Sequence, residues 1–291
     1  MKKNLFSLLL LLLIVAHPAR AFVIFDSGGT IDFSGVDPTG SAVRDGPGGQ
    51  PTTVNFLAGT DLGPTDVEGS SRLNVLAGSM VDDFDVLGSG RLEISGGSHG
   101  GVDFLEASSG SITGGSFAGC FPCLRLYGQA SAIVTSGSFS SPSQIVASTD
   151  DFATLEIRSG DFTGFVRAND DSLIEIRGGA IERVQSLDQA TVILFGDGFV
   201  AVEGSTTVVD GFGEISDGFN GTITGQLSDG SPLSVTALNG VVGSRIVLAS
   251  GALPVPALSP LAEGGLLLGL LVASSWATLL RERRVMARSR S

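Results

Sequence analysis

Short segments in which apolar and polar residues alternate recur through the middle of this 291-residue chain. In one of them, Leu155 and Ile157 fall on one side of an extended strand, and Glu156 and Arg158 fall on the other. Similar strands are expected over residues 92–94, 133–134, 174–176 and 192–194, and second strands over 102–105, 124–127, 144–147 and 165–168. No part of this region keeps a helical apolar period, so the pattern predicts strands.

Glycine-containing dipeptides separate these strands at nearly regular intervals of 18 to 23 residues. They begin at Gly78, Gly97, Gly115, Gly137, Gly160, Gly179 and Gly198. A repeat of about twenty residues with two or three short strands fits one coil of a parallel β-helix, whose inward residues are buried only when coils stack. The sequence therefore predicts an all-β fold, a single-stranded right-handed parallel β-helix with regular coils over residues 72–200.

The repeat also predicts where some side chains lie. Phe117, Phe139 and Phe162 follow successive glycine motifs by one or two residues, so an inward phenylalanine stack is expected. Glu156, Arg158, Glu175 and Arg177 should line one outer strip, where Glu–Arg pairs between coils would hold the register.

The two ends of the body differ from its middle. Asn-Gly and Asp-Gly turns cluster after Asp197, and residues 222–227 and 233–238 form a predicted hairpin around Asp229-Gly230. Residues 201–250 are therefore expected to cap the solenoid, and residues 22–71 to hold an N-terminal cap with the first irregular coils. An antiparallel β-sandwich is the alternative fold, but its hairpin turns are sparse before Asp197.

The N-terminus has the layout of an export signal. Lys2 and Lys3 precede an apolar stretch over residues 5–16, and Ala19-Arg20-Ala21 fits the small-x-small cleavage pattern. We expect residues 1–21 to be a signal peptide cleaved between Ala21 and Phe22. An uncleaved anchor is the alternative, although the apolar stretch is short for a membrane span.

The C-terminus contains a second apolar segment, over residues 264–280, which is near the lower limit for a transmembrane helix. Five arginines follow it, at positions 281, 283, 284, 288 and 290. Because positive residues stay on the cytoplasmic side, the body should face away from the cytoplasm. A plain membrane anchor would have the same features.

A proline motif precedes this segment, and it consists of Val255, Pro256, Ala257, Leu258, Ser259 and Pro260. Proline motif, apolar helix and arginine cluster at the end of an exported chain resemble the PEP-CTERM class of sorting signals, here over residues 254–291. The motif is closer to the Ile-Pro-Thr-Leu variant of that class than to Pro-Glu-Pro. The resemblance implies an exosortase-type membrane transpeptidase as partner, which cuts near the motif. It also implies delivery to the cell surface, outer membrane or extracellular matrix of a Gram-negative bacterium.

Charge is distributed unevenly along the chain, whose net charge is −13. Residues 22–253 contain no lysine and nine arginines against 28 aspartates and glutamates. Such an acidic body disfavours nucleic acid, whose phosphates require clustered Lys and Arg. The 42 glycines lack the three-residue period of collagen.

Few residues offer catalytic chemistry. His99 is the only histidine of the body; it follows a Gly-Gly-Ser turn, so we expect an exposed turn residue. Cys120 and Cys123 cannot supply four zinc ligands alone, and no helix is predicted beside them as in redox motifs. A local disulfide is expected in an oxidising compartment, with free thiols or a catalytic dithiol as alternatives.

Acidic pairs are the one candidate metal site. Asp150 and Asp151 precede Asp170 and Asp171 by twenty residues, about one coil, and would form an acidic ladder. Like charges in register are unfavourable, so a bound Ca²⁺ could offset them; solvated turn carboxylates are the alternative. Asp82, Asp83 and Asp85 form another acidic cluster. No other cofactor is expected.

These features favour a non-enzymatic exported protein of the cell surface or matrix, with a rigid acidic solenoid. A carbohydrate-active β-helix enzyme, a lyase or hydrolase, is the alternative. The Asp clusters and Arg167 suit it, but the body has no lysine base, no tryptophan and one tyrosine. Binding of an extracellular polysaccharide without catalysis is the third possibility.

Overall fold

The computed structural model describes residues 23–37, 39–215, 217–240 and 243–251. They form 23 strands and no helix. The predicted signal peptide, over residues 1–21, and the predicted sorting signal, over residues 254–291, lie outside these residues. Among the described residues, none belongs to a helix that is apolar and long enough to cross a membrane.

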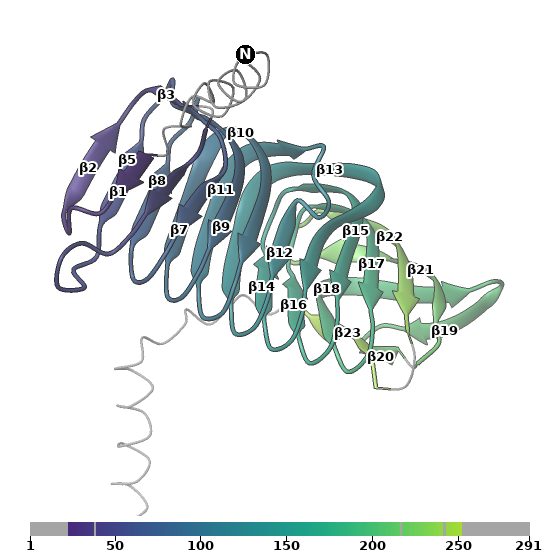
Figure 1. The fold of residues 1–291 in the computed structure, drawn as a ribbon. Helices are drawn as coiled ribbons and strands as arrows, with labels where there is room; N and C mark the ends of the chain where they lie inside the picture. The colour runs from purple at the N-terminus through teal and green to yellow at the C-terminus, as the bar shows by residue number, and fades with distance from the viewer. Residues whose placement is uncertain (1–22, 38, 216, 241–242, 252–291) are drawn as a thin grey trace, which may run out of the picture. The chain divides into compact units, whose positions relative to one another are not determined.

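The strands form parallel ladders in which each coil is hydrogen-bonded to the next, and these ladders make a β-solenoid of about nine turns (Figure 1). The first ladder contains β2 (Thr30–Phe33), β5 (Thr53–Phe56), β8 (Arg72–Val75), the starts of β10 (Arg91–Phe104), β11 (Ser109–Ala118) and β13 (Ser131–Thr149), then β14 (Thr154–Ile157), β16 (Leu173–Ile176), the start of β18 (Thr191–Glu203), and β23 (Arg245–Ser250). The predicted parallel β-helix is confirmed.

Two further ladders complete each coil. The second contains β3 (Val36–Asp37), β6 (Asp61–Leu62), the start of β9 (Met80–Val86), the middle or end of β10, β11 and β13, and the starts of β15 (Asp161–Ala168) and β17 (Ala180–Ser186). The third contains β1 (Val23–Phe25), β4 (Ser41–Val43), β7 (Thr65–Val67), the ends of β9 and β10, β12 (Leu124–Leu126), the ends of β13, β15 and β17, and β22 (Pro232–Asn239). Parallel pairing therefore extends to Val23, well before residue 72.

The turn from the third ladder to the first has the same form in seven coils. It has four residues, and the amide of the fourth donates to the carbonyl of the first at 3.1–3.3 Å. Its second residue has a positive φ of 55–72° and is Gly69, Gly88, Glu106, Gly128, Asp151, Asp170 or Asp188. Its fourth is a small, buried Ser, Gly or Ala. Glycine and aspartate tolerate this left-handed conformation, which explains why acidic residues recur in these turns.

The predicted phenylalanine stack is confirmed. The rings of Phe117, Phe139 and Phe162 lie on one another with centroids 4.6 Å apart and planes within 8° of parallel. The prediction for His99 was wrong, because this side chain is only 5% exposed and continues the same stack. His99 pairs in register with Phe117, and it follows Gly97 as Phe117 follows Gly115, so the backbone turns its side chain inward.

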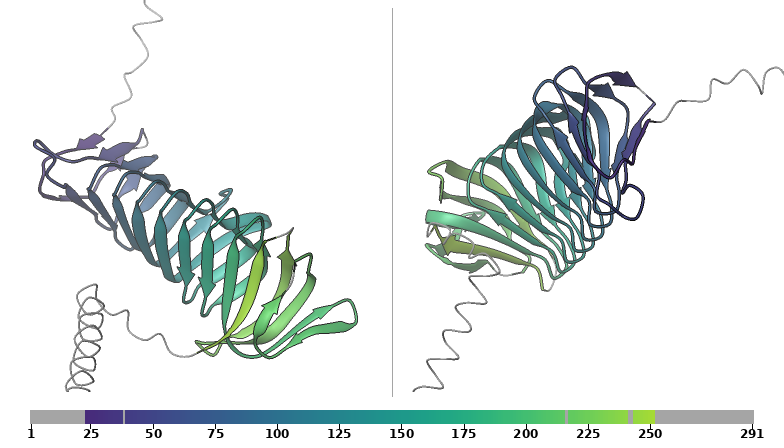
Figure 2. Two further views of the ribbon diagram at one scale, coloured as in Figure 1. Left: turned by 90° about the horizontal axis from the view of Figure 1, so that it is seen from below. Right: turned by 90° about the vertical axis from the view of Figure 1, so that its left-hand side faces the viewer.

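The C-terminal end is closed by antiparallel strands (Figure 2). These are β19 (Thr206–Asp210), β20 (Gly213–Ile215) and β21 (Asn220–Leu227). The predicted hairpin is confirmed, because β21 pairs antiparallel with β22 around Asp229. Its turn is fastened to the coils where the Gly179 amide donates to Asp229 Oδ2 at 3.0 Å. The antiparallel sandwich is excluded for the body, whose described strands pair in parallel before this cap.

Candidate functional site

A column of charged side chains runs along the outside of the third ladder. Asp66, Asp85, Asp103 and Arg125 are partners in register in four successive coils. Each is the middle residue of a three-residue strand segment whose flanking side chains are buried, so alternation directs the charged group outward. Three carboxylates and one guanidinium are thereby brought together from residues spread over sixty positions of the chain.

Beside this column lies a groove of about 770 Å³. It is lined by residues 82–85, 100–101, 103, 119–122 and 125, together with Pro64. The floor comes from strands β9 and β10, and one wall is the loop between β11 and β12. This groove is the candidate functional site.

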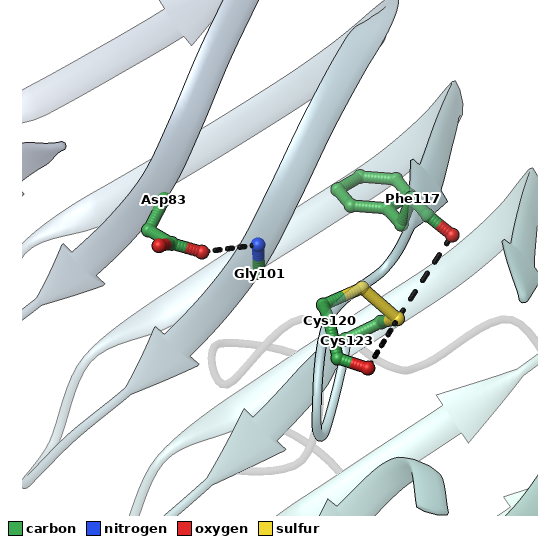
Figure 3. The surroundings of a disulfide bond; sticks show 5 residues. All are labelled: Asp83, Gly101, Phe117, Cys120 and Cys123. Atoms are coloured by element: carbon green, nitrogen blue, oxygen red, sulfur yellow. Dashed lines mark hydrogen bonds between the residues drawn. A yellow bond between two sulfur atoms is a disulfide. The ribbon is translucent and has the colours of Figure 1, made fainter. Parts of the chain in front are cut away.

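The wall of the groove is held by a disulfide between Cys120 and Cys123, whose Cα atoms are 4.7 Å apart (Figure 3). Cys123 is fully buried, whereas Phe121 between the two cysteines is 65% exposed. The Phe121–Pro122 peptide bond is cis. The short closed loop thus presents an aromatic ring at the rim of the groove.

Asp83 is positioned by the backbone of the next coil. Its Oδ1 accepts a hydrogen bond from the Gly101 amide at 2.5 Å (Figure 3). Gly100 makes this approach possible, because a β-carbon at that position would overlap the Asp82 carbonyl oxygen. The glycine pair therefore belongs to the construction of the site.

The carboxylates of Asp66 and Asp103 are partly withdrawn from water, and that of Asp85 is more exposed. Burial raises the pKa of Asp103 to about 6; Asp85 and Asp83 add to the effect and Arg125 opposes it. Burial, then the neighbouring Asp83, raises the pKa of Asp85. Burial, followed by Asp85 and Glu68, raises the pKa of Asp66, against the attraction of Arg44. Asp103 is therefore poised to exchange a proton at mildly acidic pH.

Arg125 supplies the cation of the groove. Its guanidinium carbon lies 4.8 Å from the centroid of the Tyr127 ring, a cation–π contact that orients the side chain. Together the groove offers carboxylate acceptors, one guanidinium donor and the Phe121 ring. These are groups that bind the hydroxyls and the apolar face of a sugar.

Sequence reasoning identified Asp82, Asp83 and Asp85 as a cluster, but it did not include Asp66, Asp103 or Arg125. The available signal was the spacing of Asp66, Asp85 and Asp103, which are 19 and 18 residues apart, close to one coil. Only the register shows that these positions coincide on one face.

The four aspartates proposed for calcium lie elsewhere, in the turns from the third ladder to the first. The flanking register aligns Asp150 with Asn169 and Asp151 with Asp170, so the two acidic pairs are offset by one residue. Asp150 accepts hydrogen bonds from Asn169 Nδ2 at 2.9 Å and from Ser148 Oγ at 3.1 Å. Asp151 and Asp170 are the turn residues with positive φ, and Asp171 is exposed.

No group of three or more His, Cys, Asp or Glu side chains in the described ranges is arranged to hold a metal ion. Calcium binding by these aspartates stays a prediction, and calorimetric titration of the protein with Ca²⁺ tests it directly.

The predicted Glu–Arg strip is confirmed on the first ladder. Arg177 Nε lies 3.1 Å from Glu156 Oε1 in the preceding coil, and Arg158 Nε lies 2.9 Å from the same oxygen. The hydrogen bond from Arg158 lowers the pKa of Glu156, with further lowering by Arg177. This strip joins coils and is a structural feature.

Comparison of the chain with families of proteins, with characterised proteins and with solved structures finds no match.

Proposed function

We propose that the chain is an exported surface or extracellular-matrix protein, in which a rigid acidic β-solenoid is delivered by a C-terminal sorting signal. The observation that carries this proposal is the continuous first ladder, in which ten strands from β2 to β23 are linked coil by coil. At about 4.8 Å per strand this ladder is roughly 43 Å long. A stack of coils that each bury residues against their neighbours is suited to act as a stiff spacer.

The two ends of the chain contain the segments that would direct export and sorting. The proposal includes a signal peptide over residues 1–21, a transmembrane helix over 264–280 and an exosortase-type transpeptidase that acts at Val255–Pro260. Lys and Arg flank these apolar segments and lysine is missing from the body, which supports separate roles for ends and body. A right-handed winding is also proposed, because parallel crossovers favour that hand.

Intact mass spectrometry of the protein recovered from the surface of its host tests this route. We expect a chain that begins at Phe22 and ends near the proline motif. The double substitution Pro256→Ala and Pro260→Ala should retain the tail to Ser291, whereas Ala252→Ser, outside the motif, should be processed as the wild type. A surface protein that still carries residues 261–291 in the wild type would contradict the proposal.

The groove supports a second candidate, binding or cleavage of an acidic or neutral polysaccharide. The specific observation is Asp103, whose pKa of about 6 suits a general acid, beside Arg125 and the exposed Phe121 ring. Incubation with pectin, alginate and cell-surface glycans should release reducing or unsaturated ends if the groove is catalytic. Asp103→Asn should abolish that release, and Asp188→Asn, in an exposed turn, should not. Glycan binding without release would indicate an adhesin.

A further inference from the structure

The N-terminal end of the solenoid is an open edge within the part of the chain that the structure describes. Strands β1, β2 and β3 begin the three ladders, and each pairs with a strand on one side only, namely β4, β5 and β6 (Figures 1 and 2). No described strand pairs with the opposite sides of β1, β2 and β3. An edge of this kind is a template for another β-strand.

The hydrogen bonds define which peptide groups point to the open side. Phe25 accepts from the Arg44 amide, Gly29 and Phe33 accept from Thr53 and Leu57, and Gly35 accepts from Asp61. Alternate residues of a strand point to opposite neighbours. The peptide groups of Ile24, Thr30, Asp32 and Val36 therefore point away from the second coil.

Apolar side chains accompany these free peptide groups. Val36 is 71% exposed and Ile24 is 49% exposed. Val23, Ile31 and Phe33 pack against the core but are only partly buried, whereas Val54 and Phe56, at the equivalent positions of the next coil, are fully buried. The end of the core thus has apolar surface to cover.

The ends of the mature chain are too short to cover this edge, an argument that depends on the processing proposed above. Cleavage after Ala21 leaves one residue before β1. Cleavage near the proline motif leaves at most nine residues after Gly251. Nine extended residues reach about 31 Å, and the first ladder is about 43 Å long. The occupant therefore comes from another molecule.

The C-terminal end of a second copy cannot continue the parallel ladders into the open edge. Its last strands, β22 and β23, are already paired antiparallel with β21 and β20. Head-to-tail stacking therefore cannot continue the parallel ladders at β22 and β23, whereas the N-terminal edges of two copies are identical and can pair with each other.

We propose that two copies of the chain associate through their N-terminal ends, about a two-fold axis that passes between the Ile31 residues of both. A two-fold axis makes paired edge strands antiparallel. Thr30 of one copy then lies opposite Asp32 of the other, and these are the β2 residues whose peptide groups point outward, so each such pair exchanges two hydrogen bonds. In this register Asp32 of each copy lies opposite Thr30 of the other, so the two Asp32 carboxylates are not opposite each other.

The same axis places β3 of one copy alongside β1 of the other. The two most exposed apolar residues of the end, Val36 and Ile24, then cover each other. One symmetry operation therefore satisfies the free peptide groups and the apolar surface together.

Sedimentation equilibrium of the mature exported protein tests the association. We expect a dimer whose dissociation constant rises at least tenfold in the double variant Ile24→Lys and Val36→Lys. Val208→Lys, a matched charge on β19 at the other end of the solenoid, should leave the dimer unchanged. A monomer at high protein concentration with a native circular dichroism spectrum, or edge variants that dimerise as the wild type does, would overturn the inference. If the intact mass shows that residues 1–21 are retained, this result contradicts the proposed processing and not the proposed dimer.

Cysteine pairing tests the register that the proposed axis sets. Paired residues of a hydrogen-bonded antiparallel site have Cα atoms about 5.5 Å apart, within reach of a disulfide. An oxidised mixture of Thr30→Cys and Asp32→Cys proteins should give a cross-linked dimer, and each variant alone should give much less. Equal cross-linking in the mixture and in the separate variants would contradict the proposed axis.

Discussion

His99 and Phe117 occupy the same inward position in consecutive coils, with ring centroids 5.2 Å apart. His99 Nε2 is 2.9 Å from the Gly96 carbonyl oxygen, and its Nδ1 is buried with no hydrogen-bond partner among the residues that the structure describes. A single imidazole therefore stands at the end of a stack that is otherwise built from phenylalanine.

This relationship predicts acid sensitivity. Burial lowers the pKa of His99 below 6.5, so in acid the unfolded chain binds a proton that the folded protein resists. The free energy of unfolding should be highest above pH 6.5 and should fall as the pH decreases below that value. His99→Phe should remove this dependence and should raise the unfolding free energy by about 1 kcal/mol at pH 7, since a buried unpaired nitrogen is lost.

Urea unfolding of both proteins between pH 4.5 and 8 measures this effect. The relevant quantity is the difference in free energy between variant and wild type, which cancels the titration of all other groups. A difference that does not change with pH would show that His99 is not protonated on unfolding.

Asp103 predicts the opposite pH dependence. Its pKa is raised from 3.8 to about 6, so the folded protein holds a proton that the unfolded chain releases between these values. The contribution of Asp103 to stability is complete below pH 3.8 and is lost as the pH rises to about 6. Asp103→Asn should therefore be more stable than the wild type at pH 7, by on the order of 2 kcal/mol after allowance for partial exposure.

Thermal unfolding of Asp103→Asn at pH 3.5 and pH 7 provides the measurement. The two proteins should unfold at similar temperatures at the lower pH and should separate at the higher one. Asp188→Asn, the same change of carboxylate to amide in an exposed turn, is the matched control.

We expect position 100 to tolerate no residue larger than glycine. In Gly100→Ala the new methyl group would overlap the Asp82 carbonyl and approach Asp83 Oδ1, so strands β9 and β10 must separate locally. We expect a loss of about 3 kcal/mol of unfolding free energy. Gly29→Ala, whose β-carbon would meet nothing closer than Ser27 Oγ at 3.7 Å, should be nearly neutral in the same denaturant titration.

The turn position of Asp170 predicts a difference between substitutions. Its φ of 55° suits glycine and asparagine, but it strains a β-branched residue. Asp170→Gly should keep the stability of the wild type, and Asp170→Val should lose about 1–2 kcal/mol. If Asp170 instead holds calcium, both variants should lose the heat of Ca²⁺ binding in calorimetry.

The sequence predicts the coil repeat because two local signals agree, the alternation around Leu155 and Ile157 and the regular glycines. Spacing alone predicts the stack at Phe117, Phe139 and Phe162. The Gly-Gly-Ser turn before His99 predicts an exposed residue, but its position two residues after Gly97 is the one that Phe117 occupies after Gly115. Counting from the glycine places it inward.

The groove could not be assembled from sequence in the same way. Asp66, Asp103 and Arg125 come from different coils, and coils here vary between 18 and 23 residues because loops of different length are accommodated outside the ladders. A shift of one residue reverses the face of every side chain. Side chains can therefore be assigned to a common face only when the strand register is known. The offset between Asp150–Asp151 and Asp170–Asp171 shows the same.

The uniform four-residue turn has a consequence for how such a chain can change in evolution. Residues 154–172 form one complete coil, and residue 173 enters the next at the position that residue 154 occupies. Duplication or deletion of such a unit would preserve every junction, since the incoming and outgoing turns have the same form. The length of this solenoid is therefore a heritable variable that gene rearrangement can adjust in steps of one coil, while the closed C-terminal end and the open N-terminal end stay as they are.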